Sequence, residues 1–259
     1  MPPWCRDFVV VVVVATTGQR ISDTRTNARA GNADAQGVMS AWIMLFAAAA
    51  AVPDTLLATF DGAKGTSYRW SDMNDPVMGG ASTSSFREDK THKTGIFNGT
   101  CAIVKFLNAP GFAKITTANW FAKFKDISAH IGGGMQLRVR STTPTYTGYR
   151  LGFAAKGVPR TSPYGGGSFK GNFALKNTTD WQVASVPFNA FSYDWSGYTG
   201  RCDTKDPGGQ QHHCCTPTSP KYCPTAEYLA TVTDLEIWAE GVAGDFHLEV
   251  EWIGASSAL

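Results

Sequence analysis

The stretch RWSDMNDPVMGGASTSSF, from Arg69 to Phe86, combines a tryptophan, an Asn-Asp-Pro sequence and two glycines with a run of hydroxyl side chains. Asp75 precedes Pro76, and a residue before proline is biased away from the helical region towards extended or turn geometry. The side chains of Asn74 and Asp75 can also hydrogen-bond to their own nearby backbone. The stretch therefore predicts a bent start to a strand.

The remaining residues of this stretch fit a corner of a fold. Gly79 and Gly80 permit positive φ or the close approach of another chain segment. Met78 is a flexible apolar side chain and Trp70 a large anchor, while Ser82 begins a polar run that we expect to face outward. No nucleophile is paired with a base here, so we interpret the stretch as structural. The alternative is that its polar side chains face a ligand or partner.

The composition is that of a globular protein. The chain has 259 residues, of which 43% are apolar, and its 23 basic and 21 acidic residues nearly balance. With no long run of charge, nothing indicates a nucleic-acid partner or an anionic membrane surface. The 27 glycines, 15 phenylalanines and 8 tryptophans favour a β protein with glycine turns and aromatic packing.

Period-two alternation of apolar and polar residues predicts strands throughout the region after Leu56, and few segments have a helical period. The predicted strands are Thr100–Leu107, Gly111–Thr117, Gly134–Ser141, Tyr146–Ala155, Ser168–Lys176, Asp180–Phe188, Val232–Glu240 and Asp245–Gly254. Such a series implies an all-β sandwich of two antiparallel sheets. We expect one domain, over residues 56–255.

Residues 1–55 are predicted to be a leader outside the mature fold. Phe8–Ala15 and Trp42–Val52 are apolar, but neither reaches the about 18 to 20 residues that cross a bilayer as a helix. Each suits the hydrophobic region of an export signal, so we expect the mature chain to begin near Leu56 without a membrane span. Met39 could start a complete signal by itself. The alternatives are a compound organelle-targeting leader and a disordered or membrane-associated tail.

The segment between Phe191 and Thr231 interrupts the strands and reads as a surface insertion at about residues 195–230. Its four cysteines are Cys202, Cys214, Cys215 and Cys223. They predict two disulfides in one of three pairings. The segment is rich in Pro, Gly and Thr and cannot bury enough apolar surface to hold itself in place, so we expect disulfides to stabilise it. Zinc is the rival interpretation because His212 and His213 adjoin Cys214, but the spacing matches no zinc pattern.

Cysteine usage and two sequons favour an exported or organelle-lumenal, oxidising location. Asn98-Gly99-Thr100 and Asn177-Thr178-Thr179 are candidate glycosylation sites that fit a secretory route. The alternative locations are the mitochondrion and the plastid. Cys101 lies in an apolar run and is predicted to be a buried thiol.

Several segments together resemble one protein family. Trp70 to Thr83, WSDMNDPVMGGAST, resembles the signature of the complex I intermediate-associated protein 30 (CIA30) family. Further segments resemble the family's in the same order along the chain: GIFNGTCAI (95–103), GFAKITT (111–117), KDISAHIGGGMQLRVR (125–140), YRLGF (149–153), DWQVASVPFNAF (180–191) and GDFHLEVEWIGA (244–255). The resemblance spans nearly all of the predicted mature region.

The resemblance implies a galactose-binding-like jelly-roll β-sandwich without accepted catalytic residues. Mitochondrial members resemble assembly factors for respiratory complex I, and plastid relatives serve photosystem biogenesis. This sequence lacks the G-x-G-x-x-G pattern of an attached nucleotide-binding domain, and its cysteine-rich insertion and leader differ from those of a matrix protein.

No catalytic residues, cofactor or firm metal site are predicted. The sequence contains no G-x-S-x-G, H-E-x-x-H or Cys-His signature. The alternative is a structural calcium ion bound by Asp61, Asp75 and Glu251, although these residues show no defined ligand spacing.

Two functional hypotheses follow. The first is a non-catalytic assembly factor or chaperone-like protein that binds a polypeptide partner during biogenesis of a membrane complex. The second is an exported lectin-like module that binds glycans through a sheet face or loops. We expect the aromatic side chains available for stacking in either case to be exposed: Tyr146, Tyr149, Tyr164, Trp195 and Tyr198.

Overall fold

The computed structural model describes residues 52–75, 79–117, 123–161 and 167–259. The chain divides into two compact units, Met1–Ala47 and Ala48–Leu259, and every described residue belongs to the second unit. Residues 1–51 of the predicted leader therefore lie outside the described residues. So do three residues of the predicted sites, Pro76, Met78 and Tyr164.

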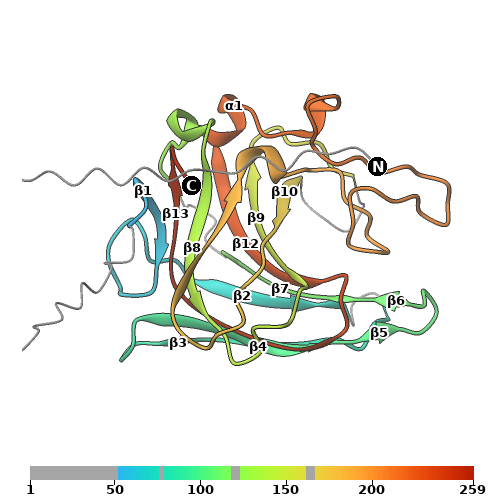
Figure 1. The fold of residues 1–259 in the computed structure, drawn as a ribbon, viewed down its shortest axis with the longest axis horizontal. Helices are drawn as coiled ribbons and strands as arrows, with labels where there is room; N and C mark the ends of the chain where they lie inside the picture. The colour runs from blue at the N-terminus through green and yellow to red at the C-terminus, as the bar shows by residue number, and fades with distance from the viewer. Residues whose placement is uncertain (1–51, 76–78, 118–122, 162–166) are drawn as a thin grey trace, which may run out of the picture. The chain divides into compact units, whose positions relative to one another are not determined.

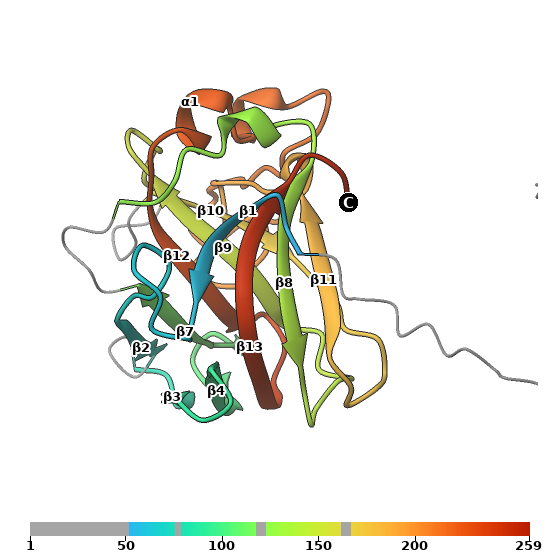
Figure 2. The same cartoon turned by 90° about the vertical axis from the view of Figure 1, so that its left-hand side faces the viewer.

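Two antiparallel sheets build the described unit (Figures 1 and 2), which confirms the predicted all-β sandwich. Sheet A has the order β11-β8-β13-β4-β3, and β1 also pairs with β13. Its strands are β1 (Thr55–Thr59), β3 (Thr83–Asp89), β4 (Thr94–Cys101), β8 (Gly134–Arg140), β11 (Gln182–Pro187) and β13 (Gly244–Ser256). Figure 2 shows β11, β8 and β13 side by side.

Sheet B has the order β10-β9-β12-β7-β2. Its strands are β2 (Trp70–Asn74), β7 (Phe112–Thr117), β9 (Tyr149–Ala155), β10 (Ser168–Asn172) and β12 (Val232–Glu240). A separate hairpin, β5 (Ile103–Val104) with β6 (Ala109–Pro110), extends away from the two sheets at the lower right of Figure 1.

Helical structure among the described residues is short. Its elements with described bounds are the 3-10 segments η2 (Ser128–His130), η3 (Phe188–Ala190) and η4 (Pro220–Tyr222) and the single-turn helix α1 (Ala226–Leu229). None of the helices in the described ranges has the length and apolar character needed to cross a membrane.

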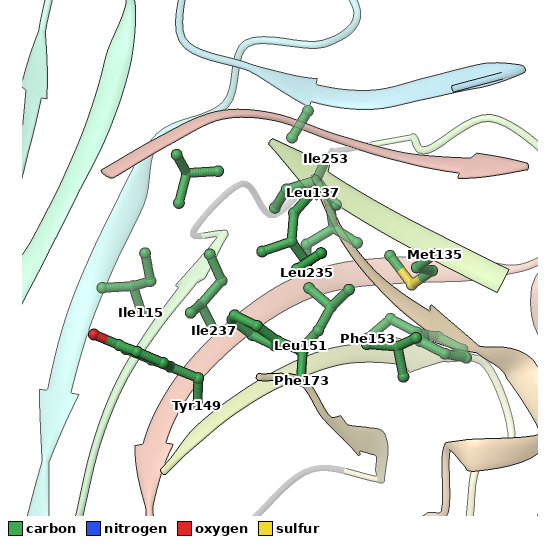
Figure 3. Close-up of a cluster of buried hydrophobic side chains, with 14 of the residues drawn as sticks. Ile115, Met135, Leu137, Tyr149, Leu151, Phe153, Phe173, Leu235, Ile237 and Ile253 are labelled. Carbon is green, nitrogen blue, oxygen red and sulfur yellow. The ribbon is translucent and has the colours of Figure 1, made fainter. Parts of the chain in front are cut away.

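The core lies between the sheets and follows the period-two pattern of the strands. On β8, Met135 and Leu137 are fully buried, while Arg138 between Leu137 and Val139 points to the opposite face and is only partly buried. Figure 3 shows Leu137 of sheet A facing Leu235 of sheet B across the core. Alternation in the sequence therefore determines which side chains fill the sandwich.

One predicted strand, Thr100–Leu107, is wrong. Strand β4 ends at Cys101, and the chain then forms the β5–β6 hairpin, in which Leu107 N–H donates to Val104 O at 3.1 Å. Asn108 closes the turn with φ 50°, a conformation that asparagine tolerates better than most residues. Each of the other predicted segments contains one strand.

Replacing Leu137 by alanine should lower the free energy of unfolding by about 2 to 5 kcal/mol, because it leaves a cavity in the fully buried core. Urea unfolding followed by circular dichroism measures this change. Ser185→Ala, on the exposed face of β11, is the control and should change it by less than about 0.5 kcal/mol. Equal effects of the two substitutions would contradict the assignment of Leu137 to the core.

Candidate functional site

Asp75 follows strand β2, and only 3% of its surface is exposed. Its Oδ1 accepts a hydrogen bond from the backbone N–H of Ser82 at 2.8 Å. Its Oδ2 accepts one from the Ser82 hydroxyl at 2.8 Å and another from the backbone N–H of Phe112 at 3.1 Å. A buried carboxylate is strongly unfavourable unless hydrogen bonds replace its water. Asp75 therefore ties together β2, the start of β3 and β7. We call Asp75 and Ser82 the corner.

The corner also holds the base of the β5–β6 hairpin. Ser82 Oγ accepts a hydrogen bond from the backbone N–H of Ala102 at 3.0 Å. The N–H of Gly111 donates to Ala102 O at 2.8 Å, so the residues that flank the hairpin are bonded to each other. Phe112, the next residue, is bound to Asp75. The hairpin therefore emerges from a fixed base.

Two glycines are required for the approach to Asp75. A Cβ atom at Gly80 would lie 2.2 Å from Asp75 Cγ, and one at Gly111 would lie 1.5 Å from Asp75 Oδ2. Either distance is far inside van der Waals contact, so only glycine fits. Gly79 has φ +80°, which also favours glycine. Because Gly111 is distant from the signature in sequence, no local pattern indicates its role.

The other described signature residues also have structural partners. Trp70 is buried, and its ring lies 5.8 Å from that of Phe60 and 6.1 Å from that of Phe86. The side chains of Asn74 and Ser84 are hydrogen-bonded to each other. Asp75 and Ser82 are inside the protein, so the expectation that Ser82 faces outward is wrong: its hydroxyl is bound to Asp75. Among the described polar residues of the signature, Asn74 is half-buried, and Ser71, Asp72 and Thr83 are exposed.

The hairpin presents apolar side chains to solvent beside this corner. Phe106 is 69% exposed and Ile103 is 46% exposed. A Cβ atom at Gly79 would lie 3.6 Å from the Phe106 ring, so the hairpin tip lies against the signature loop. We call Ile103 and Phe106 the hairpin surface. Exposed large apolar side chains that cluster are typical of a surface that contacts another molecule.

The outer face of sheet B carries charged side chains that are buried. Lys170 of β10 lies 2.7 Å from Glu240 Oε2 of β12, and Arg150 Nε of β9 lies 3.7 Å from the same oxygen. We call these three residues the ion cluster. Burial lowers the pKa of Lys170, while the Glu240 carboxylate raises it. Burial lowers the pKa of Arg150 in the same way, against the effect of Glu240.

Tryptophan rings cover the ion cluster. Lys170 Nζ lies 5.0 Å from the ring centre of Trp195 and 4.3 Å from that of Trp238, and the guanidinium of Arg150 lies 5.4 Å from Trp195. Trp195 belongs to the insertion, whose Gly200 carbonyl accepts hydrogen bonds from Arg150 at 3.1 and 3.3 Å. The insertion therefore covers part of the outer face of sheet B.

Comparison with known proteins identifies the family. Residues 58–205, more than half of the chain, match the model of the family described as Complex I intermediate-associated protein 30 (CIA30). The chain belongs to the CIA30 family. No curated protein matches the sequence.

Solved structures similar to the CIA30 domain of this chain have low identity. The family 11 carbohydrate-binding module of cellulase Lic26A-Cel5E of Clostridium thermocellum is 12% identical, with a TM-score of 0.44, and the match covers 81% of this chain and 98% of that one. PfGH50B is 9% identical with a TM-score of 0.41, and the match covers 75% of this chain. The chain spans about a quarter of the length of PfGH50B, since 23% of that chain is covered.

The expected exposure of three aromatic side chains is wrong. Tyr146, Tyr149 and Trp195 are buried in the CIA30 domain. Tyr149 lies within the core in Figure 3, and its hydroxyl donates to His247 O at 2.9 Å, while the Tyr146 hydroxyl donates to Val242 O at 2.9 Å. Backbone carbonyls thus satisfy the hydroxyls and allow the rings to be buried. Of the predicted set, Tyr198 is the described residue that is exposed.

The insertion contains two disulfides, Cys202–Cys214 and Cys215–Cys223. All four sulfurs are in these bonds, so the rival zinc interpretation of these cysteines is wrong. The disulfides are consistent with an oxidising compartment. Cys101 is a buried free thiol whose pKa burial raises to about 11, and its Sγ donates to Gly111 O at 3.1 Å.

The two sequons have different surroundings. Asn177 is exposed in a bend between β10 and β11, where a glycan has room. Asn98 is half-buried within β4, between His247 of β13 and Ser85 of β3, and its Oδ1 accepts a hydrogen bond from the Ser85 hydroxyl.

The three residues considered for calcium bind protein groups instead. Asp61 accepts hydrogen bonds from the Thr59 hydroxyl and the Ala63 N–H, and Glu251 lies 3.0 Å from Arg138. Asp75 is bound to Ser82 and Phe112. Within the described ranges, no three His, Cys, Asp or Glu side chains are grouped as metal ligands.

Replacing Gly111 by alanine should lower the free energy of unfolding by about 1 to 3 kcal/mol or more, because the added methyl group would displace the Asp75 carboxylate. Urea unfolding measures this effect. Gly132→Ala is the matched control, since a Cβ there would meet no atom within 4 Å, and it should leave stability nearly unchanged. Equal stability of the two variants would contradict the role of the corner.

Proposed function

We propose that this CIA30 domain is a non-catalytic binding protein, acting as an assembly factor or chaperone-like protein that binds a polypeptide partner during biogenesis of a membrane complex. The observation that carries the proposal is the hairpin surface beside the family signature. Phe106 and Ile103 are exposed there, while most apolar side chains of the described strands are buried. Membership of the CIA30 family, over residues 58–205, supports the same role.

The corner supports this proposal because it fixes the hairpin from both ends. Ala102 before the hairpin is bound to Ser82, and Phe112 after it is bound to Asp75. A surface that is already ordered loses less conformational entropy when a partner binds. An exposed aromatic side chain on such a base is the kind of anchor that contributes strongly to protein interfaces. In this proposal, the signature contributes to partner binding by holding the β5–β6 hairpin in position.

Catalysis is not part of the proposal. The charged groups that sheet B brings together, Lys170, Glu240 and Arg150, are bound to each other and covered by the insertion. They present no free acid or base to a substrate in this arrangement.

Glycan binding is the alternative, and the structure gives it less support. Stacking on sugars needs an open aromatic face. Trp195 is buried, and the Trp238 ring has the ammonium groups of Lys114 and Lys170 4.5 and 4.3 Å from its centre. Tyr198 is exposed and is the residue on which a glycan site would depend. The disulfides agree with an exported or organelle-lumenal location for either function, and a mitochondrial or plastid location is the alternative.

Phe106→Ser should reduce partner binding at least tenfold with little loss of stability, since most of the side chain is exposed. The tagged full chain is purified from its native cells after cross-linking, and its polypeptide partners are quantified by mass spectrometry. Tyr198→Ser is the matched control, also an exposed aromatic residue, and should retain those partners.

A glycan array on the same variants separates the two functions. Partner recovery that is unchanged by Phe106→Ser would contradict the hairpin surface. Glycan binding that disappears in Tyr198→Ser, with no polypeptide partner recovered, would favour the lectin-like function instead.

A further inference from the structure

His212 is buried inside the disulfide-bonded insertion, with 2% of its surface exposed. Its Nδ1 lies 2.7 Å from Asp194 Oδ1, and its Nε2 lies 2.9 Å from Asp206 Oδ2. The imidazole thus bridges two carboxylates that both precede it in sequence, by 18 residues and by 6 residues.

Both carboxylates are held by further hydrogen bonds. Asp194 Oδ2 accepts one from the His213 N–H at 3.0 Å, and Asp206 Oδ1 accepts one from the Ser196 hydroxyl at 2.5 Å. Neither carboxylate can donate when ionised, so each nitrogen of His212 must donate. Only the imidazolium has two N–H groups. A neutral ring would point a lone pair at one carboxylate and lose that hydrogen bond.

The bridge is connected to the cover of the ion cluster. Trp195 lies between Asp194, which binds His212, and Ser196, which binds Asp206. Its Nε1 donates to Ser192 O at 2.6 Å, and its ring lies against Lys170 and Arg150. Both chain neighbours of Trp195 are therefore fixed by the bridge.

Few other charges surround the bridge. Lys221 of η4 interacts electrostatically with Asp194, and His213 is exposed and stacks on Tyr222 at 5.0 Å. On sheet B, Lys170 and Arg150 lie against the ring of Trp195, on the other side of the segment. Asp194 and Asp206 are the charged groups that hydrogen-bond to the His212 ring.

We propose that the Asp194–His212–Asp206 bridge is a pH-sensitive latch. It holds Trp195 over the ion cluster while His212 carries both ring protons, and it releases that cover when one proton is lost. The released face would contain the Lys170–Glu240 pair and the Trp238 ring. The disulfides Cys202–Cys214 and Cys215–Cys223 lie outside residues 192–201 and limit the opening of the neighbouring part of the insertion.

The direction of the pH effect follows from the surroundings of His212. Burial lowers its pKa, but the hydrogen bonds with Asp206 and Asp194 outweigh burial and raise the pKa above its ordinary value of 6.5. The latch therefore has its full stability below about pH 6.5 and loses it as the pH rises through the higher pKa of the closed state. Between those two values the opening equilibrium should increase by up to about tenfold per pH unit.

The test uses the full chain with its disulfides intact. Nitrogen-15 NMR of the histidine rings should show His212 titrating above pH 6.5, with both ring nitrogens protonated below that midpoint. Hydrogen exchange of residues 192–201, corrected for intrinsic rates, should accelerate by up to tenfold per pH unit beyond the expected intrinsic dependence. The core strands should not share this acceleration.

Variants distinguish the latch from a general effect of pH. His212→Gln should remove the pH dependence of exchange at residues 192–201, while His213→Gln, the exposed neighbour, should retain it. If His212→Gln fails to fold, the titration of His212 and the hydrogen exchange of residues 192–201 in the unsubstituted protein still test the proposal. A neutral His212 at pH 5, or corrected exchange at residues 192–201 that does not change between pH 5 and pH 9, would overturn the proposal.

Discussion

The buried carboxylate of Asp75 is the interaction on which the arrangement of this domain depends. Its hydrogen bonds to Ser82 and Phe112 join β2, the beginning of β3 and β7, which belong to different sheets. Because a buried carboxylate without partners would be costly, these segments have to meet in one geometry. Positions 80 and 111 therefore have to be glycine, since a side chain at either position would occupy the place of the Asp75 carboxylate.

This constraint connects the family signature with the proposed binding surface. The corner itself is inside the protein, and what it exposes is the hairpin that Ala102 and Phe112 anchor. The two buried polar groups of the signature, those of Asp75 and Ser82, therefore serve the proposed function by positioning the hairpin. Phe106 at the hairpin tip is accessible to a partner because 69% of its surface is exposed.

The insertion covers part of the outer face of sheet B, so this face is not open to solvent as that of an uncovered sheet would be. Trp195 lies on Lys170 and Arg150, and hydrogen bonds from Arg150 to the Gly200 carbonyl hold the segment that carries it. Charges on this face are therefore paired and covered. Whether such a face is accessible depends on the segment above it, and the bridge through His212 makes that segment sensitive to proton concentration.

Local sequence properties determined the sandwich, most of its strands and the structural character of the signature, because alternation, proline and glycine act within a few residues. Strand β3 lies at a sheet edge and has no clear apolar alternation, so the sequence indicated the bent start of a strand there but not the extent of the strand. Tertiary structure alone decided which tyrosines are buried and which cysteines pair. It also brought His212 to Asp194, and Gly111 to Asp75. These contacts join distant segments, so they depend on strand register and packing, which no local pattern specifies.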